Sequence, residues 1–166
     1  MKHLKLQHVA FIFLFGSLLS CVSVDLKPKA PTKSKIYRFA EPQAPFKKMD
    51  SDQADHAWQN SKNGNTIAVL SECSETRDPS LSGIESETIN ALTNPQTLKT
   101  ENIQFSDRGA LHTVVEGQVD GVNVKMEILT LKKNSCSYTL SYIGRSKTFE
   151  KDQPSFNQFL KGFVIP

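Results

Sequence analysis

Alternation of hydrophobic and polar positions predicts several β-strands in the middle of this 166-residue chain. Asn65–Cys73 alternates, with apolar residues on both faces at its centre, which is typical of a strand inside a sheet. Leu98–Phe105 is expected to form a further strand that leads into the turn Asp107-Arg108-Gly109. A large part of the fold is therefore expected to be sheet.

The dipeptide Asp120-Gly121 is the strongest hairpin signal in the chain, because it favours a two-residue turn between strands. It joins Leu111–Val119 to Val122–Leu131 and sets the residue pairing along both strands. On one face Glu116 then lies opposite Lys125, a cross-strand pair of opposite charge. On the other face the expected pairs are Val119 with Val122, Gly117 with Val124, Val115 with Met126 and Thr113 with Ile128.

The next turn, near Lys133-Asn134-Ser135, leads into one more antiparallel strand. We expect a three-residue loop there, which places Ile128 opposite Leu140 and Met126 opposite Tyr142. The reason is that a shift of the strand register by one residue moves every side chain to the other face of the sheet. Only a loop with an odd number of residues keeps the apolar side chains of both strands on one face.

Two segments before this hairpin have helical spacing. A short helix can begin at Asp50 or Ser51 and end at Asn63-Gly64. Its apolar residues are Ala54, Ala57 and Trp58. A second helix is expected to begin at Asp78-Pro79, since Asp is a good cap and Pro suits the first helical position, and to end before Asn94-Pro95.

The chain closes with an apolar stripe of helical spacing, after start signals at Asp152 and Pro154. The stripe consists of Phe156, Phe159, Leu160 and Phe163. A helix that lies on a membrane surface would carry several basic residues on its polar face, but Lys161 is the only one here. We therefore expect this helix to pack against the sheet.

The first twenty residues have the layout of an export signal, with basic residues before the eleven-residue apolar run Val9–Leu19. A spanning helix needs roughly 20 residues, so a transmembrane anchor is the weaker interpretation. The run ends in Leu18-Leu19-Ser20-Cys21, which resembles the lipobox of bacterial lipoproteins. That resemblance implies cleavage before Cys21, a diacylglyceryl group on its sulfur, and an acyl group such as palmitate on its new amine. The alternative is an ordinary signal peptide with a chance cysteine.

Composition and charge then separate the rest of the chain into two parts. Hydrophobic residues make up 38% and charged residues 22%, which excludes a disordered chain and an integral membrane bundle. Residues 22–48 hold seven basic and two acidic residues, whereas residues 49–166 hold eleven basic and fifteen acidic residues. The alternation of Pro and Lys in Lys27–Lys35 favours an extended spacer over a strip that binds anionic headgroups or cell wall. We expect a signal peptide at 1–20, a lipidated tether at 21–48 and one globular domain at 49–166.

The expected order of elements is helix, strand, helix, antiparallel strands and a last helix. With Ala54–Trp58, Ile67–Cys73, Val119–Val122 and Phe156–Phe163, this order resembles small bacterial lipoproteins of the PsbP/Mog1-like fold over roughly residues 46–163. The resemblance implies an α+β fold in which a twisted antiparallel sheet lies between helices, an α/β/α sandwich. The family includes photosystem accessory subunits, a binder of a small GTPase and exported lipoproteins without assigned activity. It shares no catalytic residues, so none is transferred to this chain.

Three cysteines are present, and Cys21 is assigned to lipid. Cys73 and Cys136 remain as an even pair in an oxidising compartment, where a disulfide between them is expected. The alternative is two buried thiols that lie far apart. A bridge would stabilise the fold by about 4 kcal/mol through the loop that it closes.

Candidate metal ligands and catalytic groups are few. Asp50, Asp52, Asp55 and His56 could hold a weakly bound cation, but acids at a solvated helix N-terminus explain them better. His112 is expected on the outer face of a strand or as a hydrogen-bonded polar group. Two further carboxylates, Glu85 and Glu87, cannot share one helix face. No metal and no cofactor is expected.

The sequence favours a lipid-anchored protein of the bacterial cell envelope, in the outer rather than the inner membrane because Val22 and Ser23, not Asp, follow Cys21. Its body is expected to act without catalysis, binding an envelope protein or a small ligand on the sheet face or in a sheet–helix cleft. Nucleic acid is not an expected partner, since the basic segment lacks interleaved aromatic residues. The alternatives are a passive spacer and a periplasmic hydrolase or thiol enzyme. The enzyme would need His56 or His112 beside a nucleophile or carboxylate in a pocket, for example Cys136 with His112.

Overall fold

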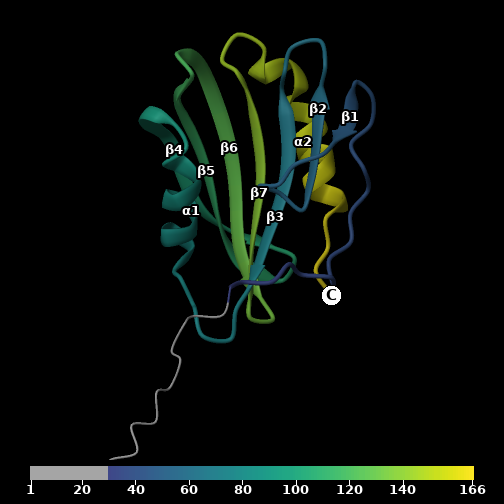
Figure 1. Ribbon diagram of the computed structural model, residues 1–166, viewed down its shortest axis with the longest axis vertical. Helices are drawn as coiled ribbons and strands as arrows, with labels where there is room; N and C mark the ends of the chain where they lie inside the picture. The colour runs from purple at the N-terminus through teal and green to yellow at the C-terminus, as the bar shows by residue number, and fades with distance from the viewer. Residues whose placement is uncertain (1–29) are drawn as a thin grey trace, which may run out of the picture.

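The computed structural model describes residues 30–166, which form seven strands and two helices (Figure 1). The strands are β1 Phe46–Met49, β2 His56–Asn60, β3 Thr66–Cys73, β4 Thr93–Phe105, β5 Arg108–Val119, β6 Val122–Lys133 and β7 Cys136–Arg145, and the helices are α1 Leu81–Ile89 and α2 Phe149–Gly162. All seven strands pair antiparallel in the order β1-β2-β3-β7-β6-β5-β4, so the expected α+β class is confirmed. The expected signal and the lipobox with Cys21 lie outside the described residues.

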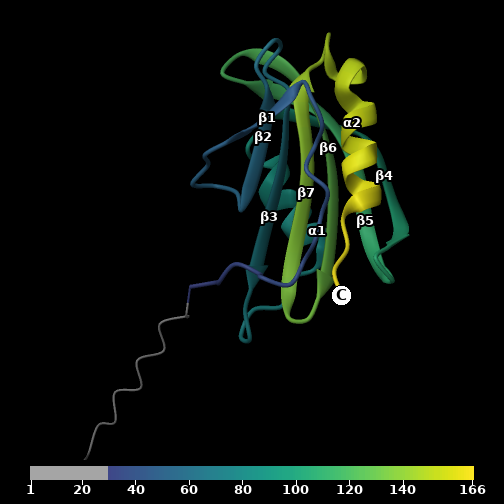
Figure 2. The same cartoon turned by 90° about the vertical axis from the view of Figure 1, so that its right-hand side faces the viewer.

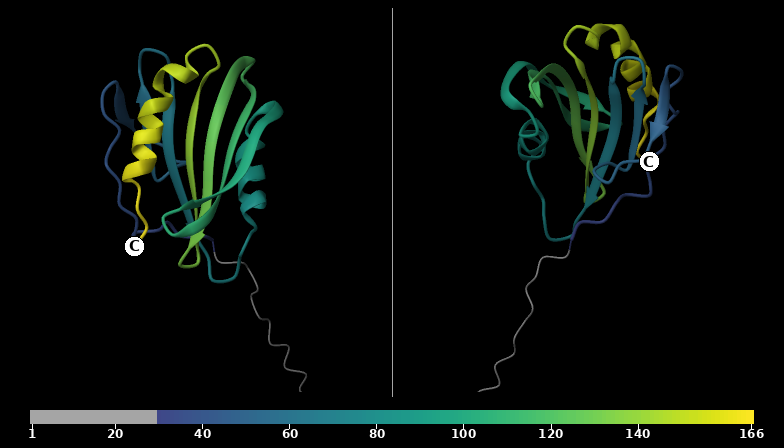
Figure 3. Two further views of the ribbon diagram at one scale, coloured as in Figure 1. Left: turned by 180° about the vertical axis from the view of Figure 1, so that it is seen from behind. Right: turned by 45° about the horizontal axis from the view of Figure 1, so that its top comes forward.

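The two helices pack on opposite faces of the sheet (Figure 2), and the view from behind places α2 before the sheet with α1 beyond it (Figure 3, left). Strand β6 contributes to both layers of the core. Met126 and Ile128 belong to a smaller cluster that Leu92, just after α1, helps to close. Leu129 and Leu131 face the larger, aromatic cluster under α2. Because side chains alternate along a strand, a continuous buried run marks a strand covered on both faces.

The hairpin predicted around Asp120-Gly121 is confirmed at every expected pair. Val119 lies opposite Val122, and Glu116 opposite Lys125. Both turn residues have positive φ, 49° at Asp120 and 76° at Gly121, which this type of tight turn requires.

The loop between β6 and β7 differs from the expected one. It has two residues, Asn134 and Ser135, both at positive φ, and it places Ile128 opposite Ser141 and Leu129 opposite Leu140. The expected three-residue loop is therefore wrong. That expectation assumed one apolar face, but β6 and β7 are buried on both faces, so the apolar pattern does not decide the register.

The helix expected after Asp50 is also wrong, because this segment forms β2. Trp58 pairs with Ile67 and Ala57 with Ala68, so the two residues point to opposite faces of the sheet. Trp58 is buried in the aromatic cluster at a ring distance of 5.6 Å from Phe159 of α2. The spacing of a few apolar residues fits either a short helix or a strand, and pairing with β3 decided in favour of the strand.

Both remaining helices are confirmed, with shifted ends. Helix α1 is capped by Ser80, whose Oγ accepts the Gly83 N–H at 3.0 Å, two residues after the expected start. Asn94-Pro95 does not end it but lies in β4. Helix α2 begins at Phe149, so Asp152 and Pro154 stand in its first turns, and its phenylalanines pack in the core as expected.

Residues 31–39, part of the expected tether, lie on the α2 side of the sheet, and we name them the N-terminal strap. Thr32 forms a β-bridge with Cys73, and Arg38 forms one with Val164. The rings of Tyr37 and Phe39 pack against the larger aromatic cluster. The folded part of the chain therefore begins well before residue 49.

Candidate functional site

A groove runs along the α1 face of the sheet, beside α1, and we name it the sheet–helix groove. Its floor includes one row of small side chains across three neighbouring strands, in which Ala57 lies opposite Ala68 and Ala68 opposite Ser141. The row ends at Ile128 of β6, which is fully buried. The groove has a volume of about 370 Å³, a size typical of small-ligand sites.

Helix α1 forms one wall of the groove. Ile84, Glu87 and Thr88 line it at positions i, i+3 and i+4, which fall on one face of the helix, and Ala91, just after the helix ends, also lines it. Met49 and the loop that follows β1 form part of the opposite side. Met49 keeps 39% of its surface exposed, a high value for a large apolar side chain at the rim of a cavity.

The groove exists because α1 is too short and too far to one side to cover this face. The helix has nine residues and packs mainly on β5 and β6. On β3 the residues Thr66, Ala68 and Leu70 therefore stay partly exposed, while Ile67 and Val69 between them are fully buried on the other face. An uncovered apolar sheet surface of this kind is a candidate binding surface.

The charges that line the groove are all of one sign. Glu72 at the end of β3 and Glu87 on α1 are its charged residues, and no lysine, arginine or histidine among residues 30–166 lines it. The loop between β1 and β2, which supplies Ser51 and Gln53, also carries the exposed Asp50 and Asp52. The groove is apolar with an acidic rim, and it suits a neutral or positively charged occupant.

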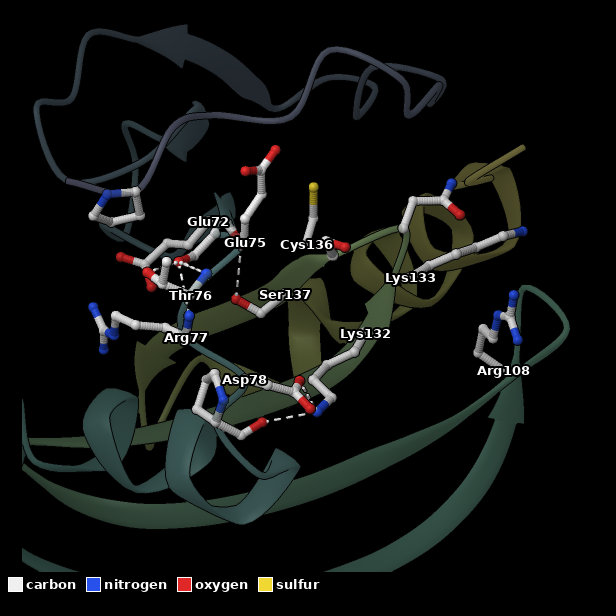
Figure 4. Close-up of a pocket in the computed structure, with 15 residues that line it drawn as sticks. Glu72, Glu75, Thr76, Arg77, Asp78, Arg108, Lys132, Lys133, Cys136 and Ser137 are labelled. Carbon is white, nitrogen blue, oxygen red and sulfur yellow. Dashed lines mark hydrogen bonds and ion pairs between the residues drawn. The ribbon is translucent and has the colours of Figure 1, made fainter. Parts of the chain in front are cut away.

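A second cavity, of about 440 Å³, lies at the end of the sheet that carries the β6–β7 turn (Figure 4). Lys132 Nζ there is 2.5 Å from Asp78 Oδ1 and donates to the Pro79 carbonyl at 3.0 Å. Lys133 donates to the Ile165 carbonyl at 2.6 Å. Lys132 therefore ties the loop before α1 to the sheet, and Lys133 ties the C-terminal residues to it. Arg77 and Arg108 lie at opposite ends of the cavity (Figure 4).

His112 lies between two carboxylates on the α2 face. Its Nδ1 is 3.0 Å from Glu101 Oε1, and its Nε2 is 2.8 Å from Glu127 Oε1. Carboxylates only accept, so both ring nitrogens donate when the imidazole is charged. The hydrogen bond to Glu127 raises the pKa of His112, against the effect of burial. His112 is the hydrogen-bonded polar group that the sequence suggested.

The buried carboxylate of Glu127 is also held by α2. Gln153 Nε2 donates to Glu127 Oε2 at 2.8 Å. Burial by itself would raise the pKa of Glu127, but the hydrogen bonds from His112 and Gln153 outweigh it and the pKa is lowered. Among the described residues both ring nitrogens of His112 bond carboxylates, and Gln153 ties one of these carboxylates to α2, so the cluster joins α2 to the sheet.

The acidic segment around His56 does not gather into a metal site. The His56 ring lies 4.9 Å from Phe39 and 5.8 Å from Trp58, centroid to centroid, and burial lowers its pKa. Asp55 Oδ2 accepts from the Ser71 backbone N–H and hydroxyl and from the Tyr37 hydroxyl. Within residues 30–166 no group of three or more His, Cys, Asp or Glu side chains could hold a metal ion.

Glu85 and Glu87 lie on different sides of α1, as the sequence indicated. Glu85 is buried under the helix, where its Oε1 accepts a hydrogen bond from the Thr113 hydroxyl. Glu87 lines the groove. The two carboxylates therefore form no acid–base pair.

Cys73 and Cys136 form a disulfide between directly opposed positions of β3 and β7. The bridge leaves no thiol at Cys136, so the thiol enzyme with Cys136 as nucleophile and His112 as base has no support here. It also joins the strands at the end of the sheet where the strap residue Thr32 pairs with Cys73.

The residues of the groove were not identified from the sequence, although a cleft between sheet and helix was expected. A usable signal is present in β7, where Ser137, Thr139 and Ser141 alternate with Tyr138, Leu140 and Tyr142. Large side chains on one face and small ones on the other predict a surface that another body can approach closely.

Comparisons with known proteins rest on the fold. The sequence matches no protein-family model, and no curated protein matches it. Among residues 30–166, no helix is both long and apolar enough to cross a membrane.

Solved structures of similar fold include proteins of three bacteria. LpqN, involved in cell envelope biogenesis of Mycobacterium tuberculosis, aligns over 86% of this chain and 88% of its own with a TM-score of 0.59 and 11% identity. CyanoP, the PsbP of Synechocystis sp. PCC 6803, aligns over 91% and 100% with a TM-score of 0.57 and 10% identity. PA94 of Pseudomonas aeruginosa, of unknown function and a putative regulator, aligns over 76% and 85% with a TM-score of 0.50 and 11% identity. At these identities the likeness shows the fold alone, and the chain is an α+β protein with a PsbP-like fold.

Proposed function

We propose that this protein is a lipid-anchored accessory protein of the bacterial cell envelope that acts by binding, without catalysis. The sheet–helix groove is its binding site, and the occupant is an envelope protein or a small ligand. The observation that carries this proposal is the row Ala57, Ala68 and Ser141, whose small side chains leave Ala68 and Ser141 partly exposed on the apolar sheet face beside α1. An apolar concave surface is what association with a partner would bury.

The envelope location has two supports. The lipobox-like Leu18-Leu19-Ser20-Cys21 predicts acylation at Cys21, and two or three acyl chains together hold a protein firmly on a membrane. The fold is also that of LpqN, a protein involved in cell envelope biogenesis. We place the protein in the outer membrane because no aspartate follows Cys21.

Lipid labelling tests the anchor. Cells that express the chain are grown with a labelled fatty acid, and the label on the wild type is compared with that on Cys21→Ser. The label should be lost in the variant, and the variant should leave the membrane fraction. A variant that keeps its label would overturn the anchor.

Site-specific crosslinking tests the groove as the binding site. A photo-reactive residue at Leu70, on the groove floor, is compared with one at Val119, an exposed residue at the tip of the β5–β6 hairpin. Leu70 should give a discrete adduct in intact cells, and Ala68→Leu in the same chain should remove it by filling the groove. A passive spacer predicts no adduct from either position, and an adduct that survives Ala68→Leu would place binding elsewhere.

A further inference from the structure

We infer that the sheet–helix groove binds an amphipathic helix of a partner protein, with lysine or arginine residues along the edges of its apolar face. This inference rests on the groove being the binding site proposed above, and it names the class of partner.

The dimensions of the groove match a helix lying beside α1. Its floor crosses β2, β3 and β7, which span roughly 10 Å at about 4.8 Å between strands. Its length from Thr66 to Glu72 is six residue steps, or about 20 Å at about 3.4 Å per step. A helix is about 10 Å across with its side chains and covers about 20 Å with roughly 13 residues.

The floor allows a helix to approach closely. Ala68 and Ser141 are partly exposed and have small side chains, so the backbone of a second element can come nearer than over leucine or phenylalanine. Ile143 and Leu70 stand one row to either side of them and offer apolar contacts. Helix α1 already packs on β5 and β6 of the same face, and the groove is the adjoining position on the uncovered strands.

The acidic rim selects the charge of that helix. Glu72 stands at one end of the groove and Glu87 on the α1 wall, with no basic side chain among the lining residues. Asp50 and Asp52 add two carboxylates on the loop across from α1. A fatty acid would bring its own carboxylate to this rim without a counter-charge, whereas lysines or arginines on the partner would pair with Glu87 on the α1 wall and Glu72 at the end of the groove.

Peptide binding tests the inference. The protein is the exported Cys21→Ser chain with its disulfide intact, and the probe is a labelled helical peptide of about 14 residues with alanine and leucine on one face and lysine along its edges. A matched peptide carries glutamate in place of lysine. The lysine peptide should bind about tenfold more tightly in fluorescence anisotropy, since several exposed charge pairs each contribute less than about 1 kcal/mol. Its affinity should fall as salt is added.

Variants separate the groove from other surfaces. Ala68→Leu should abolish binding of the lysine peptide, and Glu72→Gln with Glu87→Gln should bring its affinity close to that of the glutamate peptide. Glu41→Gln, an exposed acid outside the groove, is the control and should change neither. Circular dichroism verifies that each variant is folded.

Three outcomes would overturn this inference. They are equal binding of the two peptides, binding of a neutral long-chain alcohol in the groove while neither peptide binds, and a dimer in sedimentation that Ala68→Leu dissociates. In each of these the groove still binds, so the proposed function stands. If no probe binds and Ala68→Leu does not remove the Leu70 adduct, both the inferred helix site and the proposed binding function of the groove are rejected.

Discussion

His112 Nε2 lies 2.8 Å from Glu127 Oε1, and this contact joins β5 to a carboxylate that is 4% exposed on β6. The hydrogen bond raises the pKa of His112 above its ordinary 6.5. The pKa of Glu127 is lowered below its ordinary 4.5. Both groups are therefore charged at pH values between the lowered pKa of Glu127 and the raised pKa of His112, and the ion pair contributes to stability in this pH range.

The contribution of His112 should depend on pH in a definite direction. A raised pKa means that the stabilisation is complete below pH 6.5 and is lost as the pH rises through the raised value. We expect His112→Gln to lower the free energy of unfolding by about 1.5–3 kcal/mol near pH 6, and by less at pH 9. Urea unfolding of both proteins across this range measures the difference.

The exposed partner of His112 provides the control. Glu101→Gln removes the carboxylate on β4, which is 39% exposed, and should change stability less than His112→Gln at every pH. A difference between wild type and His112→Gln that stays constant from pH 5 to pH 9 would contradict the assignment.

Asp152 holds α2 to the loop between β2 and β3. Its Oδ2 accepts hydrogen bonds from the side-chain amides of Asn60, Asn63 and Asn65, at 2.8, 2.7 and 3.0 Å. Asp152→Ala leaves the amides of Asn60 and Asn63 without this acceptor, while the Asn65 amide still donates to the Tyr142 hydroxyl and the Thr148 carbonyl, and it should lower the free energy of unfolding by about 3 kcal/mol. Chemical denaturation measures this loss.

Glu150, two residues earlier on the same helix, is the matched control for Asp152. It is 68% exposed and pairs with Lys125, so Glu150→Ala should cost at most about 1 kcal/mol. Equal small effects from both variants would mean that the amide cluster does not hold α2 in place.

Removal of the disulfide should destabilise the protein without changing its fold. Cys73 and Cys136 are 63 positions apart, and a bridge that closes a loop of this length stabilises by about 4 kcal/mol. We expect Cys73→Ser with Cys136→Ser to lower the free energy of unfolding by about that amount. Mass spectrometry without reductant tests the bridge itself, because two free thiols in exported protein would contradict it.

The sequence predicted turns correctly where the conformational preferences of the turn residues themselves determine the backbone. Asp120-Gly121 sets its hairpin because a tight turn needs positive φ, which glycine adopts freely and aspartate tolerates. Asn134 and Ser135 also have positive φ, but serine has a weaker preference for it than glycine, so the sequence predicted the position of this turn and not its length.

Pairing between distant segments decided what the sequence left open. Trp58 lies in a strand because its ladder with Ile67 buries it under α2, and no local spacing reveals that partner. The groove has the same origin, since Ala57, Ala68 and Ser141 form one row only after three strands have paired. The alternation along each strand indicated which side chains share a face of the sheet, and the register between strands determined which side chains are neighbours on that face.

The N-terminal strap is the clearest case of structure that composition conceals. Lysine and proline around it suggest a solvated spacer, but Ser34 Oγ lies 2.9 Å from the Tyr138 hydroxyl, and the ring of Tyr37 lies 5.3 Å from that of Phe163. Tyr37→Ala with Phe39→Ala should lower the free energy of unfolding by about 2–4 kcal/mol, because both rings close the aromatic cluster under α2.

An exposed residue within the strap provides the control. Ile36 is 43% exposed between the bridges at Thr32 and Arg38, so Ile36→Ala should change stability by less than about 0.5 kcal/mol. Hydrogen exchange gives a second measurement, since the Cys73 N–H donates to the Thr32 carbonyl at 2.7 Å and should lose protection in the double variant alone. If the double variant is as stable as Ile36→Ala, the strap is a spacer after all and the folded body begins nearer residue 49.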